Sequence, residues 1–353
     1  MIVDEVSLRD FRSYERLELG LRPGIVLVTG RNGAGKTNLL ESLHVGTQGF
    51  SPRTRMDAQL IRAGASSARI SLRGRRGDTG VEVDVTLGGE GKRAELNRAK
   101  LRSVEQLRRE LSTLVFTPDR LAVVKGGPAV RRAYLDRSLA RLLPSRGSIP
   151  IEYLGAVGQR NAALRRVAAG HSSLDAVAPW TDQVVRLGEA LVGSRREAVG
   201  LVAPGFAEHA EALGLSGCTL VYEGEPPGRE ALEARLARDV ERGTTGLGPH
   251  LDDVLICAGS RELRTFGSQG EQRLAVLSLL LAEAEVLRDR NGVAPLLLLD
   301  DVLSELDEHR RLALAERLSG LGQTVVTATS SAALPVTPAQ LLAVTPGQVE
   351  VVA

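Results

Sequence analysis

Eight residues that follow a short apolar run have the types and spacing needed to bind phosphate. Gly30-Arg31-Asn32-Gly33-Ala34-Gly35-Lys36-Thr37 matches the pattern GxxxxGK[ST]. Glycines let the backbone curl so that successive N–H groups point inward, and the N-terminus of the following helix adds its positive dipole end. Such a loop holds a nucleoside triphosphate such as ATP. We expect Lys36 to reach the β- and γ-phosphates and Thr37 to place its hydroxyl on Mg²⁺.

Two carboxylates come directly after a second apolar run, Leu296–Leu299. A P-loop ATPase uses an apolar strand that ends in a carboxylate to hold its magnesium ion. We therefore expect Asp300 to face Mg²⁺. Asp301 occupies the place of a general base or water-positioning group, which would orient water for in-line attack on the γ-phosphorus.

A third segment, Ser268-Gln269-Gly270-Glu271-Gln272, precedes an apolar helical stretch. Small residues before a helix N-terminus can form an anion site. Ser268 followed three residues later by Glu271 also fits a capping box that simply starts the helix. The two interpretations are compatible, because a capped helix can still present N–H groups to a phosphate.

The elements that must position these residues follow from hydrophobic periodicity and turn signals. Residues 24–29 are almost all apolar, which is typical of a strand buried on both faces of a parallel sheet. Further strands are expected at residues 114–116, 219–222, 254–257, 296–299, 323–328 and 341–344, with hairpins pairing 2–8 with 15–19 and 69–73 with 81–87.

From about residue 130, apolar residues recur at three- and four-residue spacing, which predicts helices. Pro150, Pro179 and Pro204 are expected to divide this region into helices of ordinary length. The pattern predicts an α/β fold with a mixed-sheet core built from both ends of the chain, residues 1–118 and 246–353. Residues 119–245 would form an inserted, mainly helical lobe.

The order of four segments resembles that of an ABC-type P-loop ATPase head. The segments are Gly30–Thr37 as Walker A, Ser268–Gln272 as signature, Leu296–Asp301 as Walker B and Ser304–Asp307 as D-loop. In that class, two subunits sandwich ATP between the P-loop of one and the signature of the other. The resemblance implies a homodimer in which Ser268 and Gly270 contact the γ-phosphate bound to the partner's Lys36. Asp307 would lie at the same interface.

The opening Leu8–Tyr14 is similar to the start of SMC-like and RecF heads. SMC-like chains carry long coiled-coil arms between P-loop and signature, whereas Lys36 and Ser268 are only 232 positions apart. The chain resembles the RecF family of bacterial recombination mediators more closely, over essentially its whole length. The matching stretches are Gly30–Glu41, Phe116–Asp119 through Lys125–Gly126, Arg131–Asp136, Gly243–Gly246 with Gly248–Asp253, Phe266–Arg273 and Leu299–Arg311.

The RecF resemblance implies an ATP-dependent DNA-binding protein of recombinational repair. Such a protein binds duplex DNA or single-strand/double-strand junctions and helps to load RecA together with RecO and RecR. Hydrolysis of ATP would be slow and would reset the dimer. Two alternatives are an SMC-like structural ATPase head, which the missing arms oppose, and a transporter-type ATPase subunit or small-molecule phosphotransferase.

The sequence departs from the general ABC pattern at several positions. Asp301 stands where transporters have Glu, and its shorter side chain suits a slow, switch-like ATPase. No switch histidine follows the strand near residues 324–328, so Thr327 or Thr329 is a candidate contact for the γ-phosphate. Asp119 is a candidate for the missing Q-loop glutamine. His250, Asp252 and Asp253 could form a metal site, but without a third well-spaced ligand a structural or interface role is favoured.

Charge is distributed unevenly along the chain. The formal net charge is +2, but residues 51–166 carry 24 basic and 11 acidic groups, whereas residues 167–353 carry 15 and 26. The basic stretch is either a solvated surface or a surface for a polyanion. Basic residues crowd most closely from Arg53 to Arg132, and the only aromatic residues from Phe50 to Arg132 are Phe50 and Phe116. Contacts to duplex phosphates therefore fit better than base stacking. Arg73–Arg76 and Arg108–Arg109 are candidate contacts.

Amino-acid composition excludes several further classes of protein. Hydrophobic residues make up 43% of the 353 residues, enough for a sizeable core. The two cysteines, Cys218 and Cys257, form no CxxC pair, which excludes a disulfide framework and a Cys-rich zinc site. The first residues have early acids and no apolar segment of a secretory signal, and no apolar run reaches membrane-spanning length. We expect a cytoplasmic protein with no membrane partner.

Overall fold

The computed structural model describes residues 1–89 and 91–353 and, among these, every side chain except those of Glu105 and Arg109. The chain divides into two compact units, the core unit and the lobe unit. The core unit comprises residues 1–121, 212–214 and 276–353, and the lobe unit residues 122–211 and 215–275. The lobe unit therefore continues past residue 245, where the sequence pattern ended it, and includes the signature segment.

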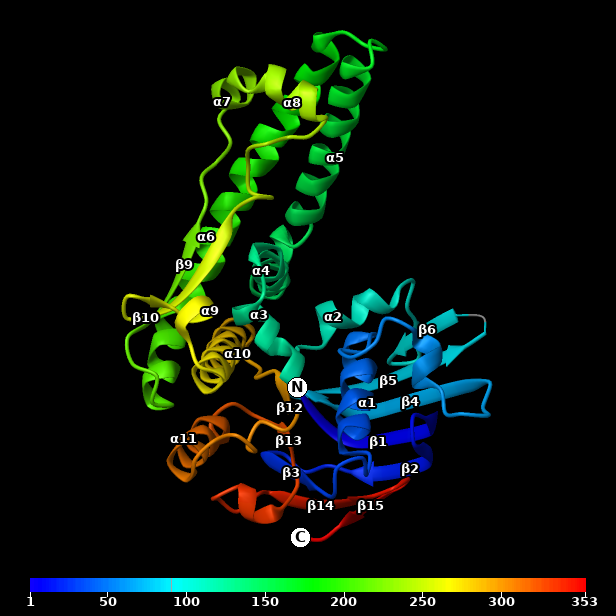
Figure 1. Cartoon of the computed structure of the whole chain (residues 1–353). Helices are drawn as coiled ribbons and strands as arrows, with labels where there is room; N and C mark the ends of the chain where they lie inside the picture. Colours follow the sequence, from blue (N-terminus) through cyan, green and yellow to red (C-terminus); the bar gives the residue numbers. More distant parts are fainter. Residues whose placement is uncertain (90) are drawn as a thin grey trace. The chain divides into compact units, whose positions relative to one another are not determined.

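The first sheet of the core unit is antiparallel and has the order β2-β1-β4-β5-β6-β7 (Figure 1). Its strands are β1 (Ile2–Phe11), β2 (Tyr14–Gly20), β4 (Ser67–Arg76), β5 (Thr79–Gly88), β6 (Gly91–Leu96) and β7 (Ala99–Lys100). Both expected hairpins are confirmed, since β1 pairs with β2 and β4 with β5. The sequence pattern did not predict β6 and β7.

The second sheet of the core unit is mixed and has the order β15-β14-β3-β13-β12-β8. Its strands are β3 (Ile25–Thr29), β8 (Thr113–Phe116), β12 (Leu296–Leu299), β13 (Thr324–Ala328), β14 (Gln340–Thr345) and β15 (Gln348–Val351). Strands β14, β3, β13, β12 and β8 are parallel to one another, and β15 is antiparallel to β14. The apolar runs that predicted these parallel strands are buried, as a sheet covered on both faces requires.

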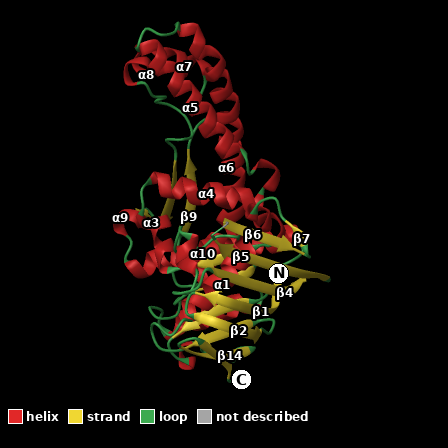
Figure 2. Cartoon of the chain, turned by 90° about the vertical axis from the view of Figure 1, so that its right-hand side faces the viewer, coloured by secondary structure: helices red, strands yellow, loops and turns green. Residues whose placement is uncertain are grey.

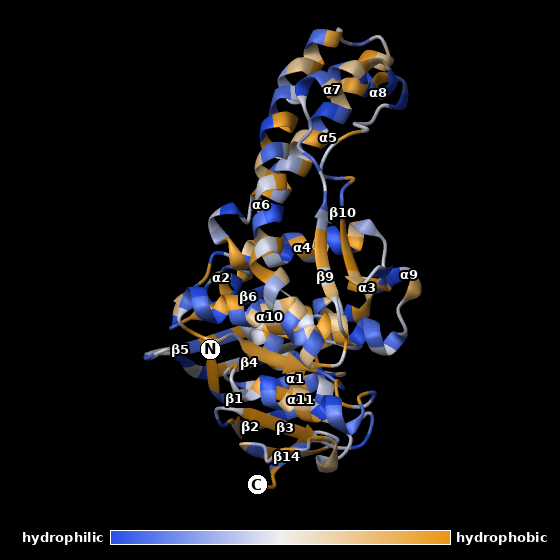
Figure 3. Cartoon of the chain, turned by 90° about the vertical axis from the view of Figure 1, so that its left-hand side faces the viewer, coloured by the Kyte–Doolittle hydropathy of each residue, from blue (hydrophilic) through white to orange (hydrophobic). Residues whose placement is uncertain are grey.

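One helix joins the two sheets of the core unit. Helix α1 (Lys36–Gln48) contacts β1, β4 and β5 of the first sheet and β8, β12 and β13 of the second. Many buried residues of both sheets and of α1 belong to one hydrophobic cluster. Figure 3 shows the strands β3 and β14 mainly in the hydrophobic colour. The core unit also contains α2 (Leu107–Glu110) and α11 (Glu308–Ser319).

The lobe unit is mainly helical (Figure 2). Its helices are α3 (Ala122–Lys125), α4 (Pro128–Leu142), α5 (Ile149–Ala168), α6 (Ala178–Ala212), α7 (Arg229–Ala234), α8 (Leu236–Arg242) and α9 (Leu263–Phe266). Helix α6 ends at Ala212, which is assigned to the core unit. Tyr153 and Val157 of α5 pack against Val184 and Leu187 of α6.

The expectation that three prolines divide the lobe into ordinary helices was wrong for Pro204. Pro150 and Pro179 lie in the first turn of α5 and α6, where a missing N–H costs nothing because that group has no helical partner. Pro204 instead lies inside α6, which runs for 35 residues. The buried face of α6 continues on both sides of it, with Val202 and Phe206, and packing of this face outweighs the lost hydrogen bond.

A small antiparallel sheet of order β11-β10-β9 completes the lobe unit. Its strands are β9 (Cys218–Glu223), β10 (Asp253–Ala258) and β11 (Arg261–Glu262). Helix α10 (Gln269–Asn291) starts in the lobe unit and ends in the core unit. Short 3₁₀ turns lie at Asp57–Leu60, Val104–Gln106, Pro118–Leu121, Pro144–Arg146, Leu174–Val177 and Ser331–Ala333. No helix of the described residues is long and apolar enough to cross a membrane.

Candidate nucleotide site and signature segment

The loop between β3 and α1 is shaped by three glycines with positive φ. These are Gly30 (153°), Gly33 (83°) and Gly35 (114°), a backbone region that other residues rarely adopt. A Cβ atom on Gly30 would lie 2.4 Å from the Val344 carbonyl oxygen, and one on Gly35 would lie 3.1 Å from the Tyr14 hydroxyl. The loop therefore requires glycine at Gly30 and Gly35 for reasons of conformation and of space, and at Gly33 for its conformation alone.

Lys36 and Thr37 lie in the first turn of α1. Lys36 Nζ donates to the carbonyl oxygens of Gly30 (2.6 Å) and Arg31 (3.1 Å), so the side chain folds back over the loop. Partial burial lowers the pKa of Lys36, and the carboxylates of Asp301 and Asp300 oppose this shift. The sequence-predicted phosphate lysine and both predicted carboxylates therefore share one electrostatic environment.

Asp300 lies where β12 ends and is 7% exposed. Its Oδ1 accepts hydrogen bonds from the Thr37 hydroxyl (3.0 Å) and the Thr327 hydroxyl (2.8 Å). Its N–H donates to the Phe116 carbonyl at the end of β8 (2.9 Å). A hydroxyl and a carboxylate oxygen are hard ligands of the kind that Mg²⁺ prefers, so this donor set fits the predicted ion.

Thr327 at the end of β13 also supports the second carboxylate. Its hydroxyl oxygen accepts the N–H of Asp301 at 2.9 Å. Thr329, the other candidate for the γ-phosphate contact, is exposed beyond the end of the strand. Thr327 is thus engaged with the Asp300 carboxylate and the Asp301 backbone N–H, contacts that the sequence pattern did not predict.

Asp301 has a backbone conformation that is uncommon outside glycine. Its φ is +50°, in the left-handed region, and its carbonyl oxygen accepts the Ser304 hydroxyl at 3.2 Å. A non-glycine residue in this region costs about 1–2 kcal/mol. The bonds from Ser304 and to Thr327 hold this strained backbone, and the Asp301 residue is exposed.

Asp307 of the predicted D-loop caps helix α11. Its carboxylate accepts the Arg310 N–H at 2.9 Å, and this bond is the main cause that lowers the pKa of Asp307. Aspartate is a favoured N-cap residue because it satisfies an N–H that has no helical partner. The residue is exposed at the surface of the core unit.

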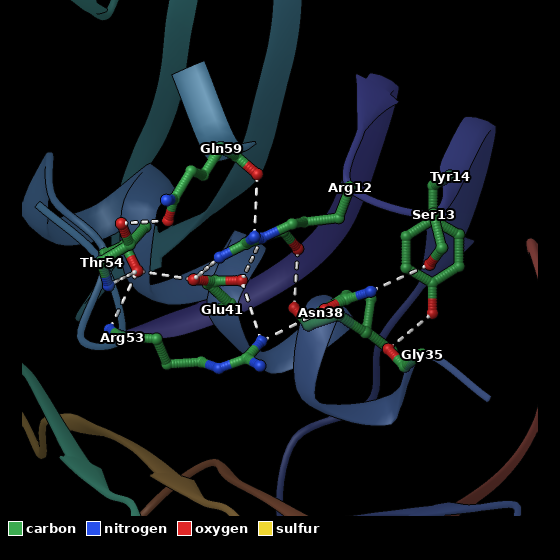
Figure 4. Close-up of polar contacts among 12 residues, drawn as sticks. Arg12, Ser13, Tyr14, Gly35, Asn38, Glu41, Arg53, Thr54 and Gln59 are labelled. Carbon is green, nitrogen blue, oxygen red and sulfur yellow. Dashed lines mark hydrogen bonds and ion pairs between the residues drawn. The ribbon is translucent and has the colours of Figure 1, made fainter. Parts of the chain in front are cut away.

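A buried carboxylate on α1 holds two arginines beside the loop (Figure 4). Glu41 is 0% exposed and pairs with Arg12 from the end of the β1–β2 hairpin through two bonds of 2.8 and 2.9 Å. Arg53, from the segment after α1, contacts the same carboxylate at 3.4 Å, and the Ser51 hydroxyl donates to it. The sequence pattern did not predict this cluster. The one feature of the sequence that could have indicated it is Glu41, a charged residue five positions after Lys36 on the buried side of α1.

The β1–β2 turn also contacts the loop directly. The Tyr14 hydroxyl donates to the Gly35 carbonyl at 3.0 Å, and Asn38 Nδ2 donates to the Ser13 hydroxyl at 3.0 Å (Figure 4). Asn38 Oδ1 in turn accepts from Arg53 at 3.3 Å. These contacts tie the start of α1 to the β1–β2 turn.

The signature segment in the lobe unit forms a reciprocal capping box. The Ser268 N–H donates to Glu271 Oε2 (2.7 Å), and the Glu271 N–H donates to the Ser268 hydroxyl (3.2 Å), which confirms the capping interpretation. Ser268 is exposed, and Gly270 is partly exposed. Gln272 is buried and donates to the carbonyls of Leu263 and Gly267, so α10 is tied to α9.

The possible metal group around His250 is engaged in protein hydrogen bonds. His250 Nδ1 lies 2.8 Å from the Tyr153 hydroxyl, and Nε2 lies 3.0 Å from the Thr245 carbonyl. Asp252 bonds the Tyr222 hydroxyl, and Asp253 pairs with Arg131. Within the described residues, no group of three or more His, Cys, Asp or Glu side chains could hold a metal ion. These bonds support a structural role for His250, Asp252 and Asp253 rather than a metal site.

The candidate DNA-contacting arginines differ in their partners. Arg73 lies near Glu5 (3.3 Å) and Glu82 (3.5 Å), and Arg76 pairs with Glu110 (3.2 Å). Arg108 lies over the Phe50 ring, 4.3 Å from its centroid. The side chain of Arg109 lies outside the described residues. Other exposed basic residues have no ion-pair partner in the described part of the chain, namely Arg55, Arg75, Lys100 and Arg102.

Asp119, the candidate Q-loop residue, is exposed in the 3₁₀ turn directly after β8. Strand β8 is parallel to β12, and Phe116 is the partner of Leu299. The turn therefore follows the strand next to the one that ends in Asp300, and Asp119 remains a candidate.

Comparisons with known proteins agree on one family. The model of the RecF/RecN/SMC N terminal domain matches residues 2–351. The DNA replication and repair protein RecF of Heliobacterium modesticaldum is 34% identical over 337 residues, which are 90% of this chain and 89% of that protein. RecF of Frankia alni is 37% identical over 362 residues, covering 95% of each chain.

Solved structures show the same relationship. The recombination mediator protein RecF with ATP, of the RecFOR pathway, has a TM-score of 0.86 and 25% identity over 99% of this chain and 97% of that one. An SMC head bound to the C-terminal winged-helix domain of ScpA has a TM-score of 0.63 at 16% identity, covering 100% of this chain and 98% of that one, and shares the fold. The chain is an α/β ABC-type ATPase head with an inserted, mainly helical lobe, and it belongs to the RecF family.

Proposed function

We propose that this protein is an ATP-dependent DNA-binding protein of recombinational DNA repair that closes as a homodimer around ATP. The observation that carries the proposal is the convergence of Thr37 and Asp300, 3.0 Å apart, at the end of a glycine-shaped loop. The names of the relatives support it, since they are DNA replication and repair proteins, and a solved relative is a RecF–ATP structure.

The core unit would bind the triphosphate. The glycines would let the loop point backbone N–H groups toward the phosphates, and the α1 N-terminus would add its dipole. Lys36 would exchange its bonds to the Gly30 and Arg31 carbonyls for bonds to the β- and γ-phosphates. Mg²⁺ held by Thr37 and Asp300 would supply positive charge to the phosphate oxygens.

Hydrolysis would depend on Asp301. Its carboxylate would orient the attacking water, while Thr327 holds the Asp301 N–H and Ser304 holds its carbonyl. Aspartate is one methylene shorter than the glutamate of transporters and positions water less well. We therefore expect slow hydrolysis that resets a switch.

The dimer would complete each site with residues of the second copy. Ser268 is exposed at the capped start of α10 and Gly270 is partly exposed, while Asp307 is exposed at the start of α11. Ser268 and Gly270 of one protomer would contact the γ-phosphate held by the partner's Lys36. ATP would then be part of the interface, and dimerisation would depend on it.

DNA would bind through phosphates without sequence preference, as duplex or as a single-strand/double-strand junction. Residues 51–166 carry the basic surplus, and several of their exposed basic side chains have no ion-pair partner in the described structure. RecR, together with RecO, would be the protein partners in loading RecA, and we assign these partners from the family alone.

Sedimentation and duplex-DNA binding test the proposal, each with and without ATP. Wild type should dimerise and bind DNA only with ATP. Lys36→Met should lose ATP binding and both ATP-dependent properties, whereas Ser268→Arg should keep ATP binding and lose dimerisation. A protein that stays monomeric with ATP and ignores DNA would contradict the proposal.

A further inference from the structure

The Arg131–Asp136 and Gly246–Asp253 segments meet in one ionic frame inside the lobe unit. Arg131 of α4 makes two bonds to Asp253, of 2.7 and 2.6 Å, at the first residue of β10. Arg195 of α6 makes two bonds to Asp136 of α4, of 2.8 and 2.9 Å, and a third to the Pro249 carbonyl at 2.7 Å. The frame thus joins α4, α6 and the start of β10.

The geometry of the frame indicates a rigid contact. The Arg131 side chain is 3% exposed and that of Asp253 is 21% exposed. A guanidinium that binds a carboxylate through two parallel bonds fixes orientation as well as distance. Removing one partner of such a buried pair leaves an uncompensated charge, so the frame resists movement of β10 relative to α4.

Arg131 also holds the other surface on which α9 packs. Its Nη1 donates to the Gly126 carbonyl at 2.7 Å, directly after α3. Helix α9 contacts α3 on one side and β10 and β11 on the other (Figure 1). Leu263, at the start of α9, is 0% exposed. One guanidinium therefore bonds β10 and the residue that follows α3, two of the three elements against which α9 packs.

Helix α9 leads directly into the signature segment. It ends at Phe266, and Ser268 begins the capping box two residues later. Gln272 of α10 donates to the Leu263 and Gly267 carbonyls, at 2.9 and 3.1 Å, so α9 and the start of α10 are joined by side-chain bonds as well as by the chain. A shift of α9 would move Ser268 and Gly270 with it.

We propose that Arg131 is a positioning residue for the signature segment, through which α4 of the helical lobe sets the placement of Ser268 and Gly270. The effect on dimerisation rests on the function proposed above. The lobe then acts on the ATP-dependent step through the signature segment. A ligand that moves α4 would change how the signature meets the partner's nucleotide.

The test compares Arg131→Met and Arg131→Lys with Arg160→Met. Arg160 forms a buried pair with Asp239 in the same unit (2.9 Å), and its other side-chain bonds within the described residues go to Thr181 and Thr245, not to β10, α3 or α9. Its variant therefore controls for loss of a buried ion pair in the lobe. Hydrogen exchange of residues 261–275 is measured on each protein without nucleotide. Fluorescent ATP binding and ATP-dependent sedimentation follow on the same samples.

Arg131→Met should speed exchange in residues 261–275 and weaken ATP-dependent dimerisation by about tenfold or more, with ATP affinity unchanged. Arg131→Lys keeps the positive charge and one bond. Its exchange rate in residues 261–275 and its ATP-dependent dimerisation should therefore lie between those of wild type and Arg131→Met. Arg160→Met should leave exchange in residues 261–275 and dimerisation as in wild type.

Unchanged exchange in Arg131→Met, or equal losses in Arg160→Met, would overturn the positioning role. If Arg131→Met does not fold, Arg131→Lys carries the same comparison. A wild-type protein that fails to dimerise with ATP would refute the proposed function instead, and the exchange measurement would still decide whether Arg131 fixes the signature segment.

Discussion

The Thr37 hydroxyl donates to Asp300 Oδ1 at 3.0 Å, across 263 positions of sequence. Thr37 lies in the first turn of α1, and Asp300 follows β12, two strands away from β3 in the parallel sheet. Because the carboxyl ends of parallel strands meet at one edge of a sheet, the fold brings a loop from one end of the chain to a carboxylate from the other. This pair defines the candidate magnesium position.

Thr327 should matter for hydrolysis more than for ATP binding. Its hydroxyl holds both Asp300 and the Asp301 N–H, so Thr327→Val leaves the two carboxylates less well oriented. We expect the rate of hydrolysis to fall by about tenfold or more, with a smaller change in ATP affinity. Single-turnover hydrolysis and nucleotide titration measure the two effects.

Thr329→Val is the matched control, because Thr329 is exposed two residues further along the chain. It should retain the wild-type rate. Equal losses in the two variants, or full activity in Thr327→Val, would contradict the assigned role of Thr327.

Glu41 should be essential for stability of the core unit. Glu41→Gln leaves Arg12 and Arg53 without their shared carboxylate. Breaking a buried pair in this way costs about 3–5 kcal/mol, and we expect about 3 kcal/mol because Arg53 is partly exposed. Urea unfolding at neutral pH measures the free energy of unfolding.

The comparison variant is Glu18→Gln. Glu18 pairs with Arg16 at 2.7 Å, but both side chains are about two-thirds exposed or more, and solvent screens such pairs. No measurable loss of stability is expected there. A Glu41→Gln protein as stable as Glu18→Gln would show that the Glu41 cluster does not stabilise the fold.

His250 should make stability depend on pH below neutrality. Burial is the main cause that lowers the pKa of His250, while its bond to the Thr245 carbonyl opposes the shift. The folded protein therefore binds this proton less readily than the unfolded chain, whose histidine pKa is about 6.5. The contribution is complete above that pH and declines as pH falls below it, by at most about 1.4 kcal/mol per pH unit.

Unfolding at pH 7.5 and pH 5.5, compared between wild type and His250→Gln, checks this expectation. The variant should lose less stability between the two pH values. His171→Gln replaces an exposed histidine and should behave as wild type. The same pH dependence in His250→Gln and wild type would rule out His250 as the titrating group.

DNA binding should weaken with salt and depend on arginines without carboxylate partners. The slope of log affinity against log salt should be roughly −0.9 for each phosphate contact. Arg75 is exposed without an ion-pair partner among the described residues, whereas its neighbour Arg73 lies near Glu5 and Glu82. Arg75→Gln should therefore reduce the slope by about one contact, and Arg73→Gln should change it less.

Filter binding of duplex DNA over a salt series, with ATP present, measures both slopes. An affinity that does not change with salt would contradict phosphate binding altogether. A larger loss in Arg73→Gln than in Arg75→Gln would instead assign the contact to the paired arginine.

The nucleotide loop could be predicted from the sequence because its requirements are local. Positive φ at Gly30, Gly33 and Gly35 needs glycine, and the residues that follow begin a helix. The parallel strands were predictable for a similar reason, since short apolar runs such as Leu296–Leu299 suit a sheet that is covered on both faces.

Long-range contacts were not predictable in this way. The Glu41 cluster joins residues from the β1–β2 turn, α1 and the segment after it, and nothing in the local pattern of Arg12 or Arg53 indicates a common partner. Pro204 marked a helix end in the sequence, yet packing of the α6 face keeps the helix continuous. Tertiary packing decided both cases.

Mixing two inactive variants tests the composite ATP site most directly. Lys36→Met lacks the phosphate lysine and Ser268→Arg blocks the signature, so each alone should show almost no hydrolysis. In a mixed dimer, the Lys36 of one protomer faces the Ser268 of the other, and one of two sites is restored. Because neither variant dimerises with itself, the dimers in an equimolar mixture are mixed ones with one working site of two, and the account predicts recovery of up to about half of wild-type ATP hydrolysis. A mixture as inactive as its components, although both variants are folded and Ser268→Arg binds ATP, would contradict it.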